Sequence, residues 1–137
     1  MPDPSELLHA PHLRRAWRVL LLLTMAVVSW FAFMPDSGGD TYAGADKVNH
    51  LLAFGTLGLL AALCAAPGAR AALLAAVALL AYGGFIEAVQ SLLPSRHAEW
   101  TDMVADATGI VLGLLAAAAL RRAWPAGRRR GGPGVSH

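Results

Sequence analysis

The sequence predicts an all-α, polytopic membrane protein: a bundle of four transmembrane helices with both termini in the cytoplasm. Of the 137 residues, 56% are hydrophobic and only 15% are charged, whereas about a quarter of the residues in a typical soluble domain are charged. The charges are concentrated in short segments that separate four long apolar stretches. Lipid is therefore the expected solvent of these stretches, and each must satisfy its backbone polar groups internally as a helix.

The first apolar stretch predicts a span at about residues 17–34. It follows a proline-containing cytoplasmic lead, residues 1–13, that we expect to be disordered. A cleaved signal peptide is the alternative interpretation. However, the stretch ends in aromatic residues and Pro35, without the small residues of a cleavage site. Because further apolar stretches follow, we interpret this one as a retained transmembrane helix.

Three further spans complete one membrane domain over residues 14–122. They are expected at about residues 47–66, 71–93 and 102–120. A soluble bundle would need a polar stripe along each helix, but the long alanine-rich faces of these stretches carry none. The basic, glycine-rich segment 123–137 is expected to be a disordered cytoplasmic tail that is attracted to anionic lipid heads.

Basic residues are distributed asymmetrically among the segments that connect the spans. The amino terminus, the turn at 67–70 and the carboxyl tail hold nine of the eleven Lys and Arg residues, and the two other connections hold only Lys47 and Arg96. The positive-inside rule therefore assigns both termini and this turn to the cytoplasm, and the two other connections to the outside. Since no basic face with interleaved aromatic residues is present, a nucleic-acid partner is not expected.

Several ionisable or amide side chains lie at the outward ends of the predicted spans. They are Lys47, His50, Glu87, Gln90, Asp102 and Asp106. A charged side chain at the centre of a membrane helix costs about 2.5–3.5 kcal/mol on insertion scales. We therefore expect these groups to face inward and to form one polar pocket that opens to the outer face. The alternative is a purely structural role as interface anchors, helix caps and packing partners.

The pattern contains packing signals but no established catalytic or metal-binding motif. Phe54 continues the helix face of His50, and Gly109 and Gly113 form a face for close packing of a neighbouring helix. His50 and the carboxylates are acceptable metal ligands, but no pair has a recognised ligand spacing. We therefore predict no metal and no cofactor. No serine lies in a nucleophile motif, so catalytic residues stay unknown and an enzyme is not the favoured interpretation.

The order and spacing of these residues resemble the VanZ-like family, small bacterial membrane proteins named after an accessory protein of glycopeptide-antibiotic resistance clusters. The resemblance covers about residues 35–120 and rests on Asp46-Lys47-x-x-His50-x-x-x-Phe54-Gly55, Glu87-x-x-Gln90, Arg96 and Asp102-x-x-x-Asp106-x-x-Gly109-x-x-x-Gly113. Asp106 stands where many members carry Asn. The resemblance implies a location in the bacterial cytoplasmic (inner) membrane and a link to resistance against teicoplanin-type lipoglycopeptides. It implies no firmly established catalytic activity.

Three functional hypotheses follow. In the leading one, the pocket binds a lipid headgroup or a lipid-linked wall precursor at the outer leaflet, with Lys47 and Arg96 as phosphate contacts. The first alternative is an enzyme acting on a lipid-linked substrate, with Glu87 or Asp102 as general base and His50 as acid or ligand. The second is a structural subunit of a membrane complex or homo-oligomer. A proton pathway is disfavoured, because the cytoplasmic halves of the spans offer no ionisable residue to continue a relay.

Overall fold

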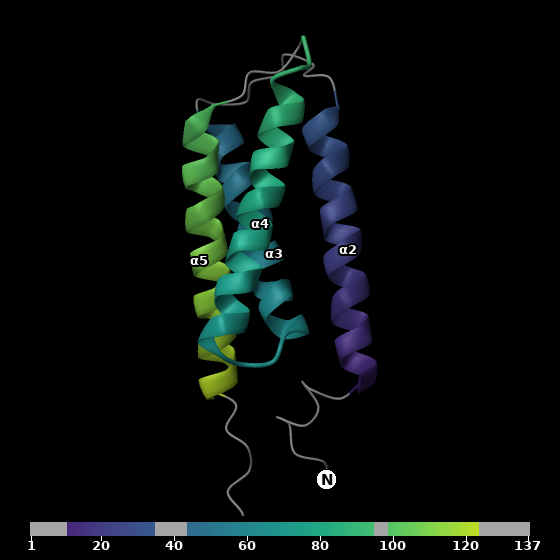
Figure 1. The fold of residues 1–137 in the computed structure, drawn as a ribbon, viewed down its shortest axis with the longest axis vertical. Helices are drawn as coiled ribbons and strands as arrows, with labels where there is room; N and C mark the ends of the chain where they lie inside the picture. Colours follow the sequence, from purple (N-terminus) through teal and green to yellow (C-terminus); the bar gives the residue numbers. More distant parts are fainter. Residues whose placement is uncertain (1–10, 35–43, 95–98, 124–137) are drawn as a thin grey trace, which may run out of the picture.

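The computed structural model describes residues 11–34, 44–94 and 99–123, and these contain four α-helices. The helices are α2 (Pro11–Phe33), α3 (Ala45–Cys64), α4 (Ala69–Gln90) and α5 (Trp100–Ala123). They run alternately up and down in one bundle (Figure 1). The end of α2, the start of α3, the end of α4 and the start of α5 therefore meet at one end, which we call the upper end after its place in Figure 1.

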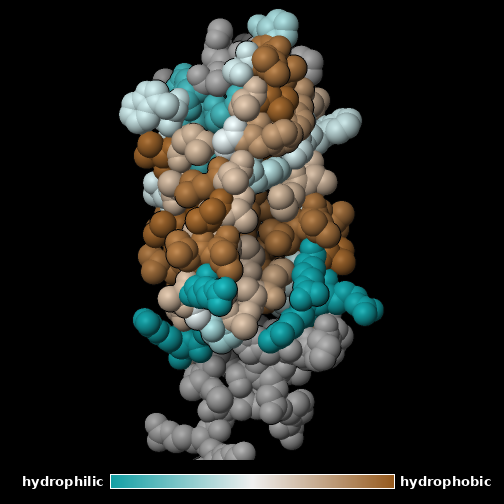
Figure 2. Space-filling view, in the orientation of Figure 1, coloured by the Kyte–Doolittle hydropathy of each residue, from teal (hydrophilic) through white to brown (hydrophobic). Residues whose placement is uncertain are grey.

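Each helix is long and apolar enough to cross a membrane. The four candidate spans contain 20 to 24 residues: Leu13–Phe33, Ala45–Cys64, Ala69–Gln90 and Trp100–Ala123. Figure 2 shows hydrophobic side chains over the middle of the visible face and hydrophilic side chains toward the two ends. The prediction of an all-α protein with four helices able to span a membrane is confirmed.

The helix ends differ most from the predicted spans at the start of α2; α4 ends at Gln90 instead of 93, and α5 ends at Ala123 instead of 120. Helix α2 begins at Pro11, so its basic residues lie within the helix. They can be accommodated there because long arginine side chains can extend from a helix toward the lipid–water boundary. Helix α4 ends at Gln90 because the next turn tightens: the amide of Leu93 donates to the Gln90 carbonyl at 3.0 Å. Glu87 consequently lies in the last turn of α4, close to the upper end.

Helices α3 and α5 form the most extensive contact in the bundle, and glycines line it. A Cβ at Gly109 would lie 2.5 Å from the Leu51 carbonyl oxygen, and one at Gly113 would collide with the Gly55 carbonyl oxygen. A Cβ at Gly58 would in turn lie 2.8 Å from the carbonyl oxygen of residue 110 on α5. The two backbones can approach this closely only because these positions lack side chains.

Helix α2 is more loosely attached. None of the residues in its most apolar window is buried, whereas 33% and 28% of the corresponding windows of α3 and α5 are. Polar contacts join it to α4. The Tyr82 hydroxyl donates to the Met25 carbonyl at 2.8 Å and lies 2.7 Å from the Ser29 hydroxyl. The Gln90 amide donates to the Ala32 carbonyl at 3.1 Å.

The buried apolar core comes from the other three helices. It consists of Phe54, Leu57, Leu79, Ile86 and Ile110. At the lower end, the Arg121 guanidinium donates to the carbonyls of Ala62 and Ala65 at 2.5 and 3.2 Å. These carbonyls belong to the last turn and C-cap of α3, so Arg121 satisfies acceptors that a helix end leaves free.

Candidate functional site

A buried histidine–carboxylate pair joins α3 to α5 near the upper end. His50 Nδ1 lies 2.8 Å from Asp106 Oδ1, and Asp106 is fully buried. The ring of Phe54, one turn further along α3, lies parallel to the His50 ring with centroids 6.3 Å apart. A Cβ at Gly83 of α4 would collide with Asp106 Oδ2. The absence of a side chain at position 83 therefore makes room for the carboxylate.

A second polar group lies above this pair. The Lys47 ammonium donates to Glu99 Oε2 at 2.8 Å and lies 3.8 Å from Asp102 Oδ1. The Thr101 hydroxyl also donates to Glu99 Oε2, at 3.0 Å. Asp102 is 1% exposed, whereas the side chains of Lys47 and Glu99 are about half exposed, at 44% and 53%. This group therefore extends from the interior of the bundle to its surface.

Glu87 connects α4 to the segment that precedes α5. Its Oε2 accepts a hydrogen bond from the backbone amide of Glu99 at 3.2 Å. Glu87 is 9% exposed, and its other carboxylate oxygen has no hydrogen-bond partner among the described residues. Glu87 thus helps to hold the start of α5 in place and still has an unused acceptor.

Unused acceptors are a shared property of three carboxylates at this end. Within the described residues, Glu87 Oε1, Asp102 Oδ1 and Asp106 Oδ2 are buried and accept no hydrogen bond from the protein. Each unsatisfied buried group costs about 1–3 kcal/mol. Because three such groups lie together, this end of the bundle is suited to hydrogen-bond donors or cations that the described protein does not itself supply.

A cavity of about 470 Å³ reaches this region between α2, α3 and α4. Its polar lining comes from Asp46, Asn49, His50 and Gln90. Its apolar lining includes Val27, Val28 and Phe31 of α2 and Leu52 and Ala53 of α3. A ligand in the cavity would therefore meet apolar side chains along its length and polar groups at one part of its wall.

The family was identified by comparison with models of known families. A model described as VanZ/LLP1 matches residues 9–121. The chain belongs to the VanZ/LLP1 family. This confirms the resemblance that the sequence suggested. Searches of curated proteins and of solved structures gave no match.

In this VanZ-like chain the structure brings most of the predicted pocket residues to the upper end. Lys47, His50, Asp102 and Asp106 make direct contacts between α3 and α5. Gln90 differs, because its amide donates to α2 and it lines the cavity. Arg96 lies outside the described residues. Of the predicted packing residues, Phe54 is 1% exposed, and Gly109 and Gly113 lie against the α3 backbone.

The predicted pocket did not include Glu99, Asp46, Asn49 or Gly83, although Asp46 begins one of the motifs on which the family resemblance rests. Asp46 carried a usable signal, since it lies four residues before His50 and therefore on the same helix face. Glu99 lies outside any helical period, and Gly83 is one of two consecutive glycines in an apolar run. Glu99 and Gly83 belong to the site because of contacts with neighbouring helices, and a local sequence pattern cannot predict such contacts.

Proposed function

We propose that this VanZ-like protein binds a lipid-linked ligand of the cell envelope in the cavity between α2 and α3. The observation that carries the proposal is the mixed lining of this cavity, with Val27, Phe31 and Leu52 in one part and His50 and Gln90 in another. The apolar residues suit a lipid chain, and the polar residues suit a head at the membrane surface. Its volume of about 470 Å³ is within the range of small-ligand sites, about 300–1,000 Å³.

The chemistry of the head follows from the charges at the upper end. Carboxylates predominate among the described residues there, and several of their oxygens are unused. They favour hydroxyl, amide or ammonium donors on the ligand. A phosphate contact through Lys47 would require this side chain to leave Glu99, to which it is bonded at 2.8 Å. Arg96 is proposed as a second phosphate contact.

We propose the bacterial cytoplasmic membrane as the location, with both termini in the cytoplasm and the polar end outward. The arginines of the described helices support this orientation, since Arg14, Arg18, Arg70 and Arg121 all belong to the lower end. In a Cys64→Ser background, a cysteine at the exposed position Leu92 should react with an impermeant maleimide added to intact spheroplasts. A cysteine at the exposed position Arg70 should react only after lysis. The reverse pattern would refute the orientation.

The direct test is to identify the lipid that copurifies with the full chain in a mild detergent by native mass spectrometry. Val27→Phe should fill the cavity and reduce the amount of bound lipid at least tenfold. Val111→Phe is a matched control, because Val27 and Val111 are 54% and 53% exposed, but only Val27 lines the cavity. Equal lipid content in wild type and both variants would contradict the proposal.

We also propose that ligand binding in the cavity lowers the sensitivity of a cell to teicoplanin. We expect the wild-type chain to lower the teicoplanin susceptibility of a sensitive host, and Val27→Phe, Glu87→Gln and Asp102→Asn to lose this effect at matched membrane levels. Val111→Phe should retain it. If wild type and all variants protect equally, the cavity and the polar end have no part in resistance. If none protects, the resistance role of the family does not extend to this chain.

An enzymatic role is the second candidate, and the His50–Asp106 pair favours it. A carboxylate that accepts the Nδ1 proton of histidine orients the ring and raises the basicity of the other nitrogen. Such a dyad could remove a proton from a lipid-linked substrate. Turnover of polyprenyl phosphate substrates by the reconstituted protein, lost in His50→Gln but retained in Val111→Phe, would support this role.

A further inference from the structure

Three side chains at the upper end lie close enough together to be candidate ligands of a metal ion. Asp46 and His50 lie one turn apart on α3, and Asp102 lies in the first turn of α5. One ligand atom from each residue can be chosen so that all three lie within 4.8 Å of one another. Imidazole nitrogen and carboxylate oxygen together form a ligand set used by Zn²⁺ and Mn²⁺.

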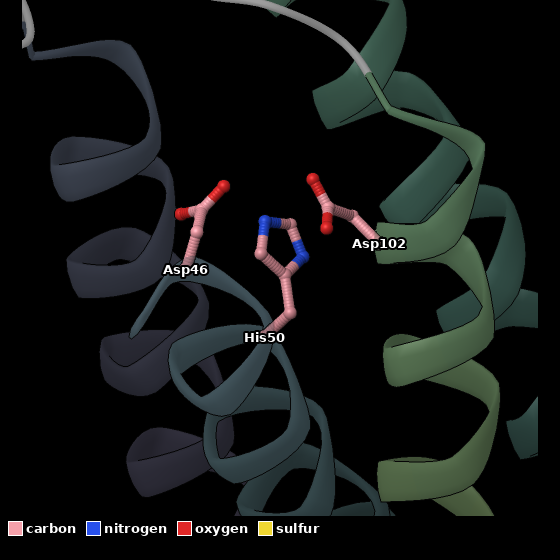
Figure 3. Close-up of side chains that lie close together, drawn as sticks. All are labelled: Asp46, His50 and Asp102. Atoms are coloured by element: carbon pink, nitrogen blue, oxygen red, sulfur yellow. The ribbon is translucent and has the colours of Figure 1, made fainter. Parts of the chain in front are cut away.

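The hydrogen bond with Asp106 orients the His50 ring. His50 Nδ1 lies 2.8 Å from Asp106 Oδ1, and an ionised carboxylate can only accept hydrogen bonds. A neutral His50 beside an ionised Asp106 therefore carries its proton on Nδ1 and keeps the lone pair of Nε2 for a metal. Figure 3 shows this second nitrogen directed into the gap between the carboxylates of Asp46 and Asp102. A carboxylate that holds the distal nitrogen of a histidine ligand is a recurrent feature of metal sites.

Asp102 supplies an independent indication that something binds in this gap. It is 1% exposed, its carboxylate is directed toward the His50 ring (Figure 3), and its Oδ1 accepts no hydrogen bond among the described residues. The Lys47 ammonium lies 3.8 Å from this oxygen but is bonded to Glu99. The ion pair with Lys47 therefore compensates the buried Asp102 charge only in part, and coordination of a metal would complete the compensation.

The excess of carboxylates at the upper end also favours the binding of a cation. The described carboxylates of the upper end belong to Asp46, Glu87, Glu99, Asp102 and Asp106, and the described cationic side chain beside them is Lys47. A divalent cation would offset part of this excess of negative charge.

We propose that Asp46, His50 and Asp102 bind one divalent metal ion of the Zn²⁺ or Mn²⁺ class, with Asp106 as the residue that positions His50. Three protein ligands leave at least one coordination position for an oxygen from outside the protein. Asp46 and His50 also line the cavity between α2 and α3. If the proposed lipid-linked ligand carries a phosphate, the metal is where this anion would bind, and this last step alone rests on the proposed function.

The test is metal binding by the purified full chain, without a lipid ligand and with its affinity tag removed. After loading with Zn²⁺ or Mn²⁺ and gel filtration, elemental analysis should find one metal ion per wild-type chain. Co²⁺ should give visible absorption bands that Zn²⁺ abolishes. Asp102→Asn and His50→Gln should weaken binding at least tenfold.

Glu87→Gln is the matched control. Glu87 and Asp102 are both buried and both have an unbonded carboxylate oxygen, but only Asp102 belongs to the proposed ligand set. Glu87→Gln should therefore retain one metal ion per chain. Because Asp46 is exposed, Asp46→Asn removes a ligand without disturbing the core and remains informative if Asp102→Asn fails to fold. Metal-free wild type, or equal binding by wild type and all variants, would overturn the metal site and leave the lipid-binding proposal to its own test.

Discussion

The contact between α3 and α5 and the contact between α2 and α4 are held together in different ways. At the first, glycines bring two backbones together, and His50 and Asp106 add a buried hydrogen bond. At the second, the Tyr82 and Gln90 side chains donate hydrogen bonds to backbone carbonyls of α2. None of the residues in the most apolar window of α2 is buried. Lipid tails are as apolar as the helices, so association in a membrane depends on close packing and hydrogen bonds.

The two contacts also differ in the side chains that they carry. The tightly packed pair α3–α5 carries Lys47, His50, Asp102 and Asp106. The cavity lies where α2 faces α3, at the margin of the bundle. If the two contacts differ in energy as they do in geometry, substitutions between α3 and α5 should cost more stability than substitutions between α2 and α4.

The largest expected effect is at the glycines of the α3–α5 contact. Gly113→Leu should destabilise the protein by about 3 kcal/mol or more, because the new side chain collides with backbone rather than with a movable side chain. Unfolding by SDS in mixed micelles, followed by tryptophan fluorescence, measures this loss. Ala116→Leu, at an exposed position of α5, is the control and should unfold like wild type. Similar unfolding of both variants would show that α5 can shift away from α3.

The buried histidine–carboxylate pair should have an intermediate effect. Asp106→Leu leaves His50 without its partner and should cost about 1–3 kcal/mol in the same unfolding assay. Asp106→Asn keeps an oxygen that can accept the Nδ1 proton and should lose less than about 1 kcal/mol. If the two variants lose the same stability, the hydrogen bond does not contribute and only the shape of the residue matters.

The smallest effect is expected at α2. Tyr82→Phe with Ser29→Ala removes two hydrogen bonds and should reduce global stability by only about 1.2 kcal/mol, at the average of about 0.6 kcal/mol for each such bond in membrane proteins. Hydrogen exchange of the α2 amides should nevertheless increase while that of α5 stays unchanged. Thr108→Val also removes a hydroxyl, but one that bonds within its own helix, and should alter neither readout. Equal exchange changes in α2 and α5 would show that the bundle opens as one unit.

The sequence predicted the class of fold because long apolar runs and basic flanks are local properties of the chain. It also brought His50 and Asp106 to the same depth, because their helices enter from the same end and helical spacing defines their faces. It could not identify which groups touch. The pairing of Lys47 with Glu99 depends on a residue between helices, and the room for Asp106 depends on Gly83 of another helix. The sequence also could not predict that α2 buries the fewest residues, because its apolar run resembles those of the other helices.

The hydrogen bonds of α2 also bear on the order of folding. Its partners Tyr82 and Gln90 lie 53 to 58 residues further along the chain. During synthesis from the amino end, α2 therefore enters the membrane before the helix that supplies these hydrogen bonds exists. Its contact with α3 is more extensive than its contact with α4 and can form first, so the hydrogen-bonded docking against α4 is expected to be a late step of assembly.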